Sequence, residues 1–364
     1  MLYKEDWELT KKRYELFWNR EVLDRTVIQV TAPRKNPIPY KKEMPEPADA
    51  EKIWTDPEYF IHKYEKEFAK TFFGGDSFPN LWINLGPGNM ATFIGSEPGY
   101  STETVWFNQV YKDWKDFKGL KYDPENKWWK ITQELTKLAL KEMDGKYQVG
   151  LTDLGGVSDI AASLRDSQNL LMDLYDYPEK VKEMQDQIHG LWNIYFFELE
   201  KILATKMKGM TAWLGIWSPE SWSPLQSDFS AMLSPDMFEK FILPYLEDEC
   251  NKLPRSIYHW DGPGEIPHLD MLLGIKNLDG IQWVPGAGKP HAGHSVWYPY
   301  LKKIQAAGKL LIIQENIPPE AVEEIINNLD PRGLVIRTQT TTEEKAKELL
   351  RSAEIWTKRR LKEL

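Results

Sequence analysis

The sequence predicts an α/β protein that folds as a (β/α)8 TIM barrel, with one domain over residues 1–364. Short apolar runs alternate with segments of helical period, and eight such runs can be counted. The last four begin about 24 to 30 residues apart, a spacing that fits a strand, a crossover helix and their loops. Buried strands that alternate with helices favour a parallel sheet covered on both faces, and eight of them favour closure into a barrel.

The amino-terminal part, residues 1–75, is predicted to be mainly a helical extension of the barrel. A helix runs to about Arg20, residues 26–31 form the first strand, and a second helix covers 57–72. A short strand follows at 81–84. Residues 85–127 are rich in glycine, aromatic and polar residues without a helical period, so we expect an irregular insertion of hairpins and long loops there.

The rest of the chain is more regular. Pro178 suits the first turn of a helix, Ser234 before Pro235 suits a second helix start, and Thr341 with Glu344 would form a capping box that opens the last helix. The six further strands are expected at 147–153, 209–215, 256–261, 279–284, 309–315 and 333–338.

Composition excludes several classes of protein. The apolar fraction is 41% and the charged fraction 28%, which is typical of a soluble globular protein. Cys250 is the only cysteine, so an internal disulfide or an all-cysteine zinc site is excluded, and a cytoplasmic location is the simplest expectation. The net charge of −9 opposes nucleic-acid binding. We expect no membrane span and no secretion signal, because apolar runs are short and the first residues are charged throughout.

Polar residues follow the predicted strands, where a barrel of this class places its chemistry. Several of the 16 tryptophans lie beside glycine or proline and would wall a cavity for a large ligand, although core and rim packing is the stronger explanation for any single one. The strand-end candidates are Asn84, Asp153, Trp213, His259, Asp261, Gln282, Trp283, Gln314, Glu315, Arg337 and Gln339, and Trp217 is a further candidate wall.

Four segments resemble the uroporphyrinogen decarboxylase superfamily, whose members include methyltransferases that exchange methyl groups with corrinoid proteins. The resemblance covers roughly residues 150–350 and implies a barrel with its pocket at the carboxyl ends of the strands. The segments are LMDLYDYPEKV (171–181), QSDFSAMLSPDMFEKFILPYL (226–246), YHWDGPGEIPHLDML (258–272) and GIQWVPG (280–286).

The decarboxylase markers of that superfamily are missing. No segment of the form RQAGRY is present, Asn84 stands where the resemblance places the catalytic aspartate, and the family tyrosine and late histidine fall near Ser163 and Gln339. An amide at Asn84 donates a hydrogen bond but supplies no negative charge. Decarboxylation of a tetrapyrrole acid is therefore the second hypothesis.

The methyltransferase branch holds zinc with a His-x-Cys pair and a later cysteine, and the resemblance places His259 and Asp261 at the pair and Gln339 near the later cysteine. We expect His259 and Asp261 to converge where the strand turns at 262–264. Nitrogen and oxygen ligands suit zinc with an oxygen substrate, or a harder divalent metal. Glu315 is the first candidate for a third ligand. Asp153 and Asp228 come next, and His291 and His294 are further imidazoles in a loop.

The leading hypothesis is a methyltransferase or demethylase that acts with a corrinoid protein on a small methylated substrate. The catalytic candidates are His259, Asp261, Asp228 and Asn84. The substrate-binding candidates are Asp153, Trp213, Trp217, Gln282, Trp283 and Gln339. The remaining alternatives are a barrel that binds a corrinoid without catalysis, and a glycoside hydrolase that uses Asp153 and Glu315 as its paired acids. Relatives in the superfamily imply a homodimer.

Overall fold

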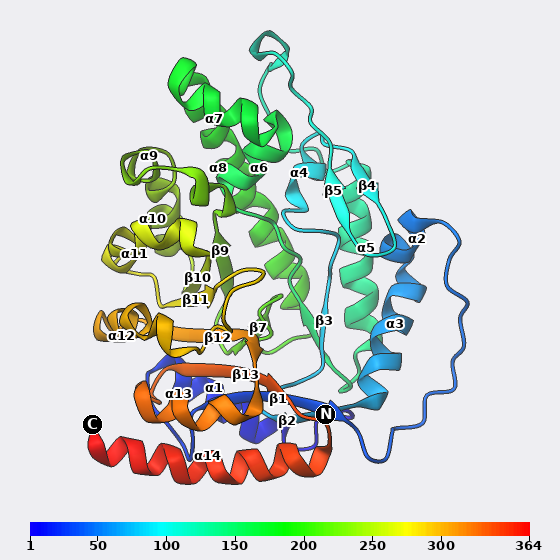
Figure 1. Cartoon of the computed structure of the whole chain (residues 1–364). Helices are drawn as coiled ribbons and strands as arrows, with labels where there is room; N and C mark the ends of the chain where they lie inside the picture. Colours follow the sequence, from blue (N-terminus) through cyan, green and yellow to red (C-terminus); the bar gives the residue numbers. More distant parts are fainter.

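The computed structural model describes residues 1–364 and shows parallel strands with helices packed outside them (Figure 1). The strands are β1 (Val27–Pro33), β2 (Thr71–Gly75), β3 (Asn80–Trp82), β4 (Pro98–Tyr100), β5 (Val105–Phe107), β6 (Gln148–Gly150), β7 (Met210–Thr211), β8 (Trp217–Ser218), β9 (Trp222–Gln226), β10 (Arg255–Asp261), β11 (Gly280–Val284), β12 (Leu310–Ile317) and β13 (Leu334–Gln339).

The helices fill the intervals between the strands. The α-helices are α1 (Trp7–Trp18), α2 (Ala50–Thr55), α3 (Pro57–Lys70), α4 (Met90–Phe93), α5 (Lys127–Glu142), α6 (Val157–Arg165), α7 (Ser167–Asp176), α8 (Pro178–Leu203), α9 (Pro235–Phe241), α10 (Leu243–Lys252), α11 (Leu269–Gly274), α12 (Tyr298–Ala306), α13 (Val322–Asn328) and α14 (Glu343–Glu363). Short 3-10 helices are η1 (Trp114–Asp116), η2 (Asp228–Met232), η3 (Pro263–His268), η4 (Ser295–Trp297) and η5 (Pro319–Ala321). No helix combines the length and the apolar composition that crossing a membrane requires.

The strands form two main ladders. In the larger ladder the order is β2-β1-β13-β12-β11-β10-β9, and every pair except β1 with β2 is parallel. In the smaller ladder the order is β3-β6-β7-β8, with β8 antiparallel to β7. These ladders confirm the α/β class. No backbone strand pair joins one ladder to the other, so closure into one barrel stays a prediction, as does the single domain.

The structure corrects the count of strands. The segment Trp222–Gln226 is a strand, β9, which pairs in parallel with β10 and was not among the eight predicted. Its Pro224 and the flanking serines are typical of a loop, which hid the strand. The antiparallel β2 was also not predicted, because the helix expected over 57–72 ends at Lys70. The expected hairpin in the insertion is confirmed as β4 and β5.

Local sequence signals predict the starts of two helices correctly and the start of a third helix one residue too early. Pro178 opens α8, and Ser234 caps α9 by accepting the amide of Met237. The last helix is capped by Thr342, which accepts the amide of Lys345, so the predicted capping box at Thr341 is wrong by one position. The helix α8 is held by buried residues spaced three or four apart, namely Val181, Met184, Ile188, Leu191 and Tyr195.

Buried charges attach the amino-terminal segment to the strands. Asp76, which is fully buried, accepts from Arg13 at 3.3 Å and from Arg25 at 2.5 Å, and its second oxygen also accepts the amide of Ile28 at 2.9 Å. Lys4 donates to the carbonyls of Phe73 and Gly75. Because buried charges are tolerated only with such partners, these contacts fix α1 against β1 and β2.

Candidate functional site

Three side chains with metal-ligand chemistry meet at the carboxyl end of β10. Asp228 is the first residue of η2, directly after β9, while His259 and Asp261 lie on β10 with Trp260 between them. Ligand atoms of the three lie within 4.8 Å of one another, and His259 Nε2 is 3.9 Å from Asp228 Oδ1. The structure therefore brings together three residues of the predicted site, which we call the Asp-His-Asp cluster.

The convergence of His259 and Asp261 has a simpler cause than the turn at 262–264 that we expected. The strand continues through Asp261, and residues two apart on a strand face the same side, so no turn is needed. Asp228 joins them because Gln226, at the end of β9, lies opposite His259 in the parallel ladder. The register of β9 against β10 thus supplies the third member.

A chain of side-chain amides leads away from His259 through the larger ladder. Gln282 on β11 places its Oε1 2.7 Å from His259 Nδ1, and its Nε2 donates to Gln314 Oε1 on β12 at 3.2 Å. Gln314 Nε2 donates in turn to Gln29 Oε1 on β1 at 2.8 Å and to the carbonyl of Leu214 at 3.0 Å. Gln282, Gln314 and Gln29 are each more than nine-tenths buried. We call these three residues the glutamine relay.

Backbone carbonyls set the direction of the glutamine relay. The carbonyl of Leu214 accepts only, so the amide nitrogen of Gln314 must face it, and the oxygen of Gln314 must face Gln282. By the same logic the nitrogen of Gln282 faces Gln314 and its oxygen faces His259, which requires a proton on Nδ1. Neutral His259 therefore keeps the lone pair on Nε2, the atom directed to the Asp-His-Asp cluster.

Arg337 on β13 anchors the far end of the relay. Its Nε donates to Gln29 Oε1 at 2.8 Å and its Nη2 to the carbonyl of Leu214 at 2.5 Å. Gln29 Nε2 donates to the carbonyl of Gly215 at 2.7 Å, which fixes that amide as well. Burial lowers the pKa of Arg337 to about 10, which leaves the guanidinium charged near neutral pH. Side chains of the larger ladder thus bind the loop that follows β7 of the smaller one.

Acidic side chains crowd the cluster. Burial raises the pKa of Asp153, at the end of β6, to about 6, with a further increase from the charge of Asp228. Burial and the charge of Asp228 also raise the pKa of Asp159 in the first turn of α6. Burial raises the pKa of Asp228 itself, although its side chain is half exposed and His259 opposes the shift. Several acids near one imidazole make this part of the site negative, so it attracts positive charge.

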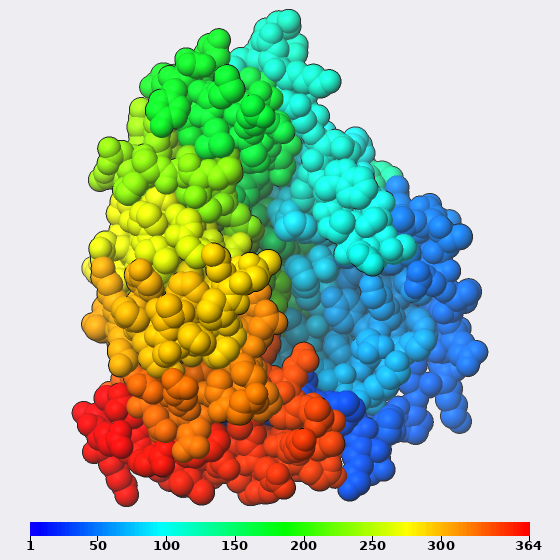
Figure 2. Space-filling model, in the orientation of Figure 1, coloured from blue at the N-terminus to red at the C-terminus, as the bar shows by residue number.

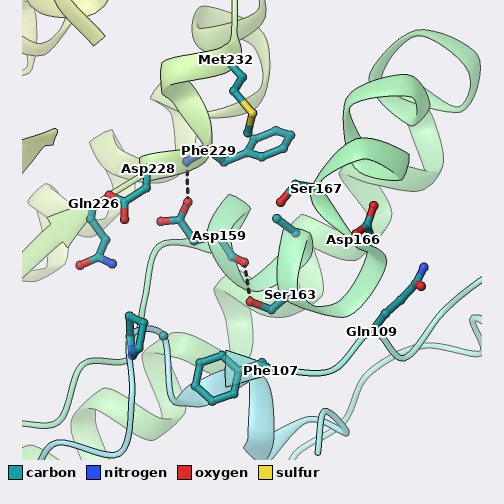
Figure 3. A pocket seen from close by; sticks show the side chains of 13 residues that line it. Phe107, Gln109, Asp159, Ser163, Asp166, Ser167, Gln226, Asp228, Phe229 and Met232 are labelled. Atoms are coloured by element: carbon teal, nitrogen blue, oxygen red, sulfur yellow. Dashed lines mark hydrogen bonds between the residues drawn. The ribbon is translucent and has the colours of Figure 1, made fainter. Parts of the chain in front are cut away.

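A pocket of about 450 Å³ opens beside the cluster, with Asp228 in its wall (Figure 3). Figure 2 shows the surface hollowed between the cyan part of the chain and the green and yellow parts. The insertion, α6, the start of α7, the end of β9 and η2 all contribute. The lining residues are Pro87, Gly88, Phe107, Gln109, Asp159, Ala162, Ser163, Asp166, Ser167, Gln226, Asp228, Phe229 and Met232.

The predicted tryptophan walls have different positions. Trp213 lies in the site, with its ring 5.0 Å from the ring of His259 at an interplanar angle of 84°. Trp283 is fully buried against Trp260 and Trp297, on the face of β11 opposite Gln282. Trp217 is buried against Trp7 of α1. The structure therefore corrects two of the three walls to core residues.

The remaining predicted residues lie outside the cluster. Asn84 accepts the amide of Gly86 in a turn after β3, and Gln339 is exposed, in the wall of a different surface pocket with Lys345 and Glu348. Glu315, the first choice for a third metal ligand, does not belong to the group of ligand atoms that lie close together, whereas Asp228, a later choice, does. The rings of His291 and His294 lie 5.6 Å apart in their loop.

Sequence reasoning predicted only Asp228 among the pocket residues, and two of those it missed, Gln226 and Asp159, are polar. Gln226 is 7% exposed and lies in the pocket wall, but its strand was not recognised. Asp159 is typical of the first turn of any helix, where a carboxylate suits the helix dipole, so its sequence position gave no signal. The two glycines at 155–156, between the predicted strand at 147–153 and α6, were the available signal for a strand-end loop there.

The fold and site together define an α/β protein with a polar, acid-rich site at the carboxyl ends of its parallel strands. No family model matches the sequence, and no curated protein sequence matches it. The chain is similar in structure to a methyltransferase from Methanosarcina mazei, with a TM-score of 0.58 and 12% sequence identity, over 95% of this chain and 98% of that one. At this identity the similarity shows a shared fold. Membership of the uroporphyrinogen decarboxylase superfamily stays a prediction.

Proposed function

We propose that this protein is a methyltransferase that moves a methyl group between a small methylated substrate in the pocket and the cobalt of a corrinoid carried by a partner protein. The observation that carries the proposal is the Asp-His-Asp cluster beside the pocket, at the strand ends where barrel enzymes place their chemistry. The fold shared with a methyltransferase supports it.

The cluster fits a divalent metal ion. Two ligands about 2.1 Å from one zinc ion lie at most about 4.2 Å apart, so His259 Nε2 and Asp228 Oδ1 at 3.9 Å are spaced to share an ion. In neutral His259 the relay leaves the lone pair on Nε2, and two carboxylates balance the charge of the ion. Bound there, a metal would act as a Lewis acid on an oxygen of the substrate. Zinc and harder divalent ions both suit this ligand set.

The chain's own residues position the substrate. Trp213 packs against His259 and blocks one side of the imidazole, while Asp228 lies in both the cluster and the pocket wall. In the transfer, the bond between the methyl carbon and its donor breaks with the electron pair left on the donor. The acceptor supplies the pair for the new bond. Holding both partners in line is the main contribution that such a site makes.

The test is incubation of the protein with free methylcobalamin or reduced cobalamin and a panel of methyl acceptors or donors, followed by the absorption spectrum of the cobalt. We expect a spectral change that depends on protein and is lost in His259→Ala, while the exposed His294→Ala retains it. No change across donors that include methyl ethers, methyl thioethers and methylated amines would refute the proposal.

A further inference from the structure

We infer that the substrate of this pocket is a cation, a methylated ammonium compound whose transferable methyl group is carried by a positively charged nitrogen. The inference rests on the proposed function and adds the substrate class to it. Its starting point is the charge of the pocket wall. Asp159, Asp166 and Asp228 line the pocket, and no lysine, arginine or histidine does.

The wall also has an amide that is free to bind a ligand. Gln226 is 7% exposed, its side chain makes no hydrogen bond within the protein, and it lies in the pocket wall (Figure 3). Its amide atoms keep some exposure in the pocket, where water or a ligand can bond them. An oxygen substituent on the substrate, such as a hydroxyl or carboxylate, would satisfy it.

Asp159 is the acid that remains for the substrate. One of its oxygens accepts the amide of Phe229 at 2.8 Å, and the other is buried without a partner. A divalent ion on the cluster would neutralise Asp228 and Asp261, because two carboxylates balance two positive charges, and Asp166 is already used to cap α7. Asp159 is then the acid of the wall that neither the ion nor a helix cap uses, with one oxygen free for a ligand. Burial raises its pKa to about 8, and a cationic ligand beside it would favour the ionised carboxylate.

Apolar walls complete a site for an N-methylated cation. Phe229 and Met232 come from η2 and Phe107 from β5, on different sides of the pocket (Figure 3). Aromatic faces attract quaternary ammonium groups, because the ring quadrupole is negative above the plane. A methionine adds a polarizable contact for methyl groups. A neutral ether of the same size would gain the apolar contacts but not the charge attraction.

The chemistry is consistent with this substrate class. When the carbon–nitrogen bond breaks, the electron pair stays on nitrogen, so a quaternary ammonium leaves as a neutral tertiary amine and needs no proton. The acceptor, the reduced cobalt of the proposed corrinoid partner, supplies the pair for the new bond to the methyl group. The neutral product loses its attraction to Asp159, which favours its release.

The experiment compares choline with 3,3-dimethyl-1-butanol, which has the same shape and no charge, by titration calorimetry of the full chain in the presence of Zn²⁺. We expect choline to bind at least about tenfold more tightly, since desolvated cation contacts of this kind are worth about that factor. Asp159→Asn keeps an oxygen for the amide of Phe229 and should abolish the preference. The exposed Asp270→Asn is the matched control and should preserve it.

Phe107→Leu is the second variant, because it tests the aromatic wall without altering an acid. It should weaken choline more than the alcohol. Equal binding of the two probes by the wild type, or a full preference in Asp159→Asn, would overturn the inference. Selective choline binding without methyl transfer to cobalt would support the substrate class and refute the proposed function. Methyl transfer from neutral ethers without any cation preference would support the proposed function and refute the substrate class.

Discussion

The glutamine relay makes a quantitative prediction for metal binding by His259. Gln282→Met keeps the length of the side chain and removes both of its hydrogen bonds, to His259 Nδ1 at 2.7 Å and to Gln314 Oε1 at 3.2 Å. Without an acceptor at Nδ1, nothing selects the tautomer that frees Nε2. Loss of such a partner typically costs about 10- to 100-fold in metal affinity, so we expect a decrease in the zinc affinity in that range.

The assay is a competition titration of Zn²⁺ against a chromophoric chelator, together with a long-range ¹H–¹⁵N correlation spectrum of the histidine side chains. The spectrum should show the Nδ1–H form in the wild type and a mixture in Gln282→Met. Gln185→Met is the matched control. Gln185, in α8, is equally buried, but its amide donates to Ser158 of α6 and to the carbonyl of Phe241 of α9, away from His259. An unchanged zinc affinity in Gln282→Met, with an unchanged tautomer, would refute the directional argument.

Three further predictions concern the site and its support. Asp228→Asn should weaken zinc binding by at least about tenfold while Glu315→Gln leaves it unchanged, and the same titration measures both. Asp153 has a pKa of about 6 in the folded state, above its unfolded value. Its contribution to the free energy of unfolding is therefore complete below about pH 4 and is lost as the pH rises through 6. The loss amounts to about 3 kcal/mol by pH 7. In urea unfolding after treatment with a chelator, Asp153→Asn should lack that part of the pH dependence of the unfolding free energy. The same pH dependence in the variant and the wild type would contradict the prediction. Asp76→Asn leaves Arg13 and Arg25 without their shared buried carboxylate and should lower the free energy of unfolding by about 3–5 kcal/mol, whereas exposed Asp270→Asn should not.

Periodicity predicted much of the fold, because buried parallel strands and amphipathic helices leave strong apolar patterns. It found β10, β11, β12 and β13 and the helix that begins at Pro178. It missed β9, where Pro224 and three serines conceal a fully buried strand. The irregular strand β12 shows a second limit, since its register shifts between Ile313 and Ile317 and no residue pattern marks that bulge.

For the site, the position of a residue at the end of a strand was a useful predictor. The alternating direction of side chains along a strand was used too little. His259 and Asp261 were recognised from their place at a strand end, and Asp228 from its place in the resembling segment. The two-residue alternation of strands would have assigned Trp283 to the core once Gln282 was placed in the site. Asp159 and the relay depend on contacts between distant elements, such as Gln314 with Leu214, which no local pattern encodes.

The loop after β7 receives hydrogen bonds from three strands of the other ladder, through Gln29, Gln314 and Arg337. The same amides that orient the imidazole therefore tie together two halves of the molecule that share no strand pair. We therefore expect that opening the contact between the two ladders would also release the orientation of His259. Hydrogen–deuterium exchange of the smaller ladder should consequently slow when zinc is added, because an imidazole held by the ion would also hold the amides that bond the loop after β7.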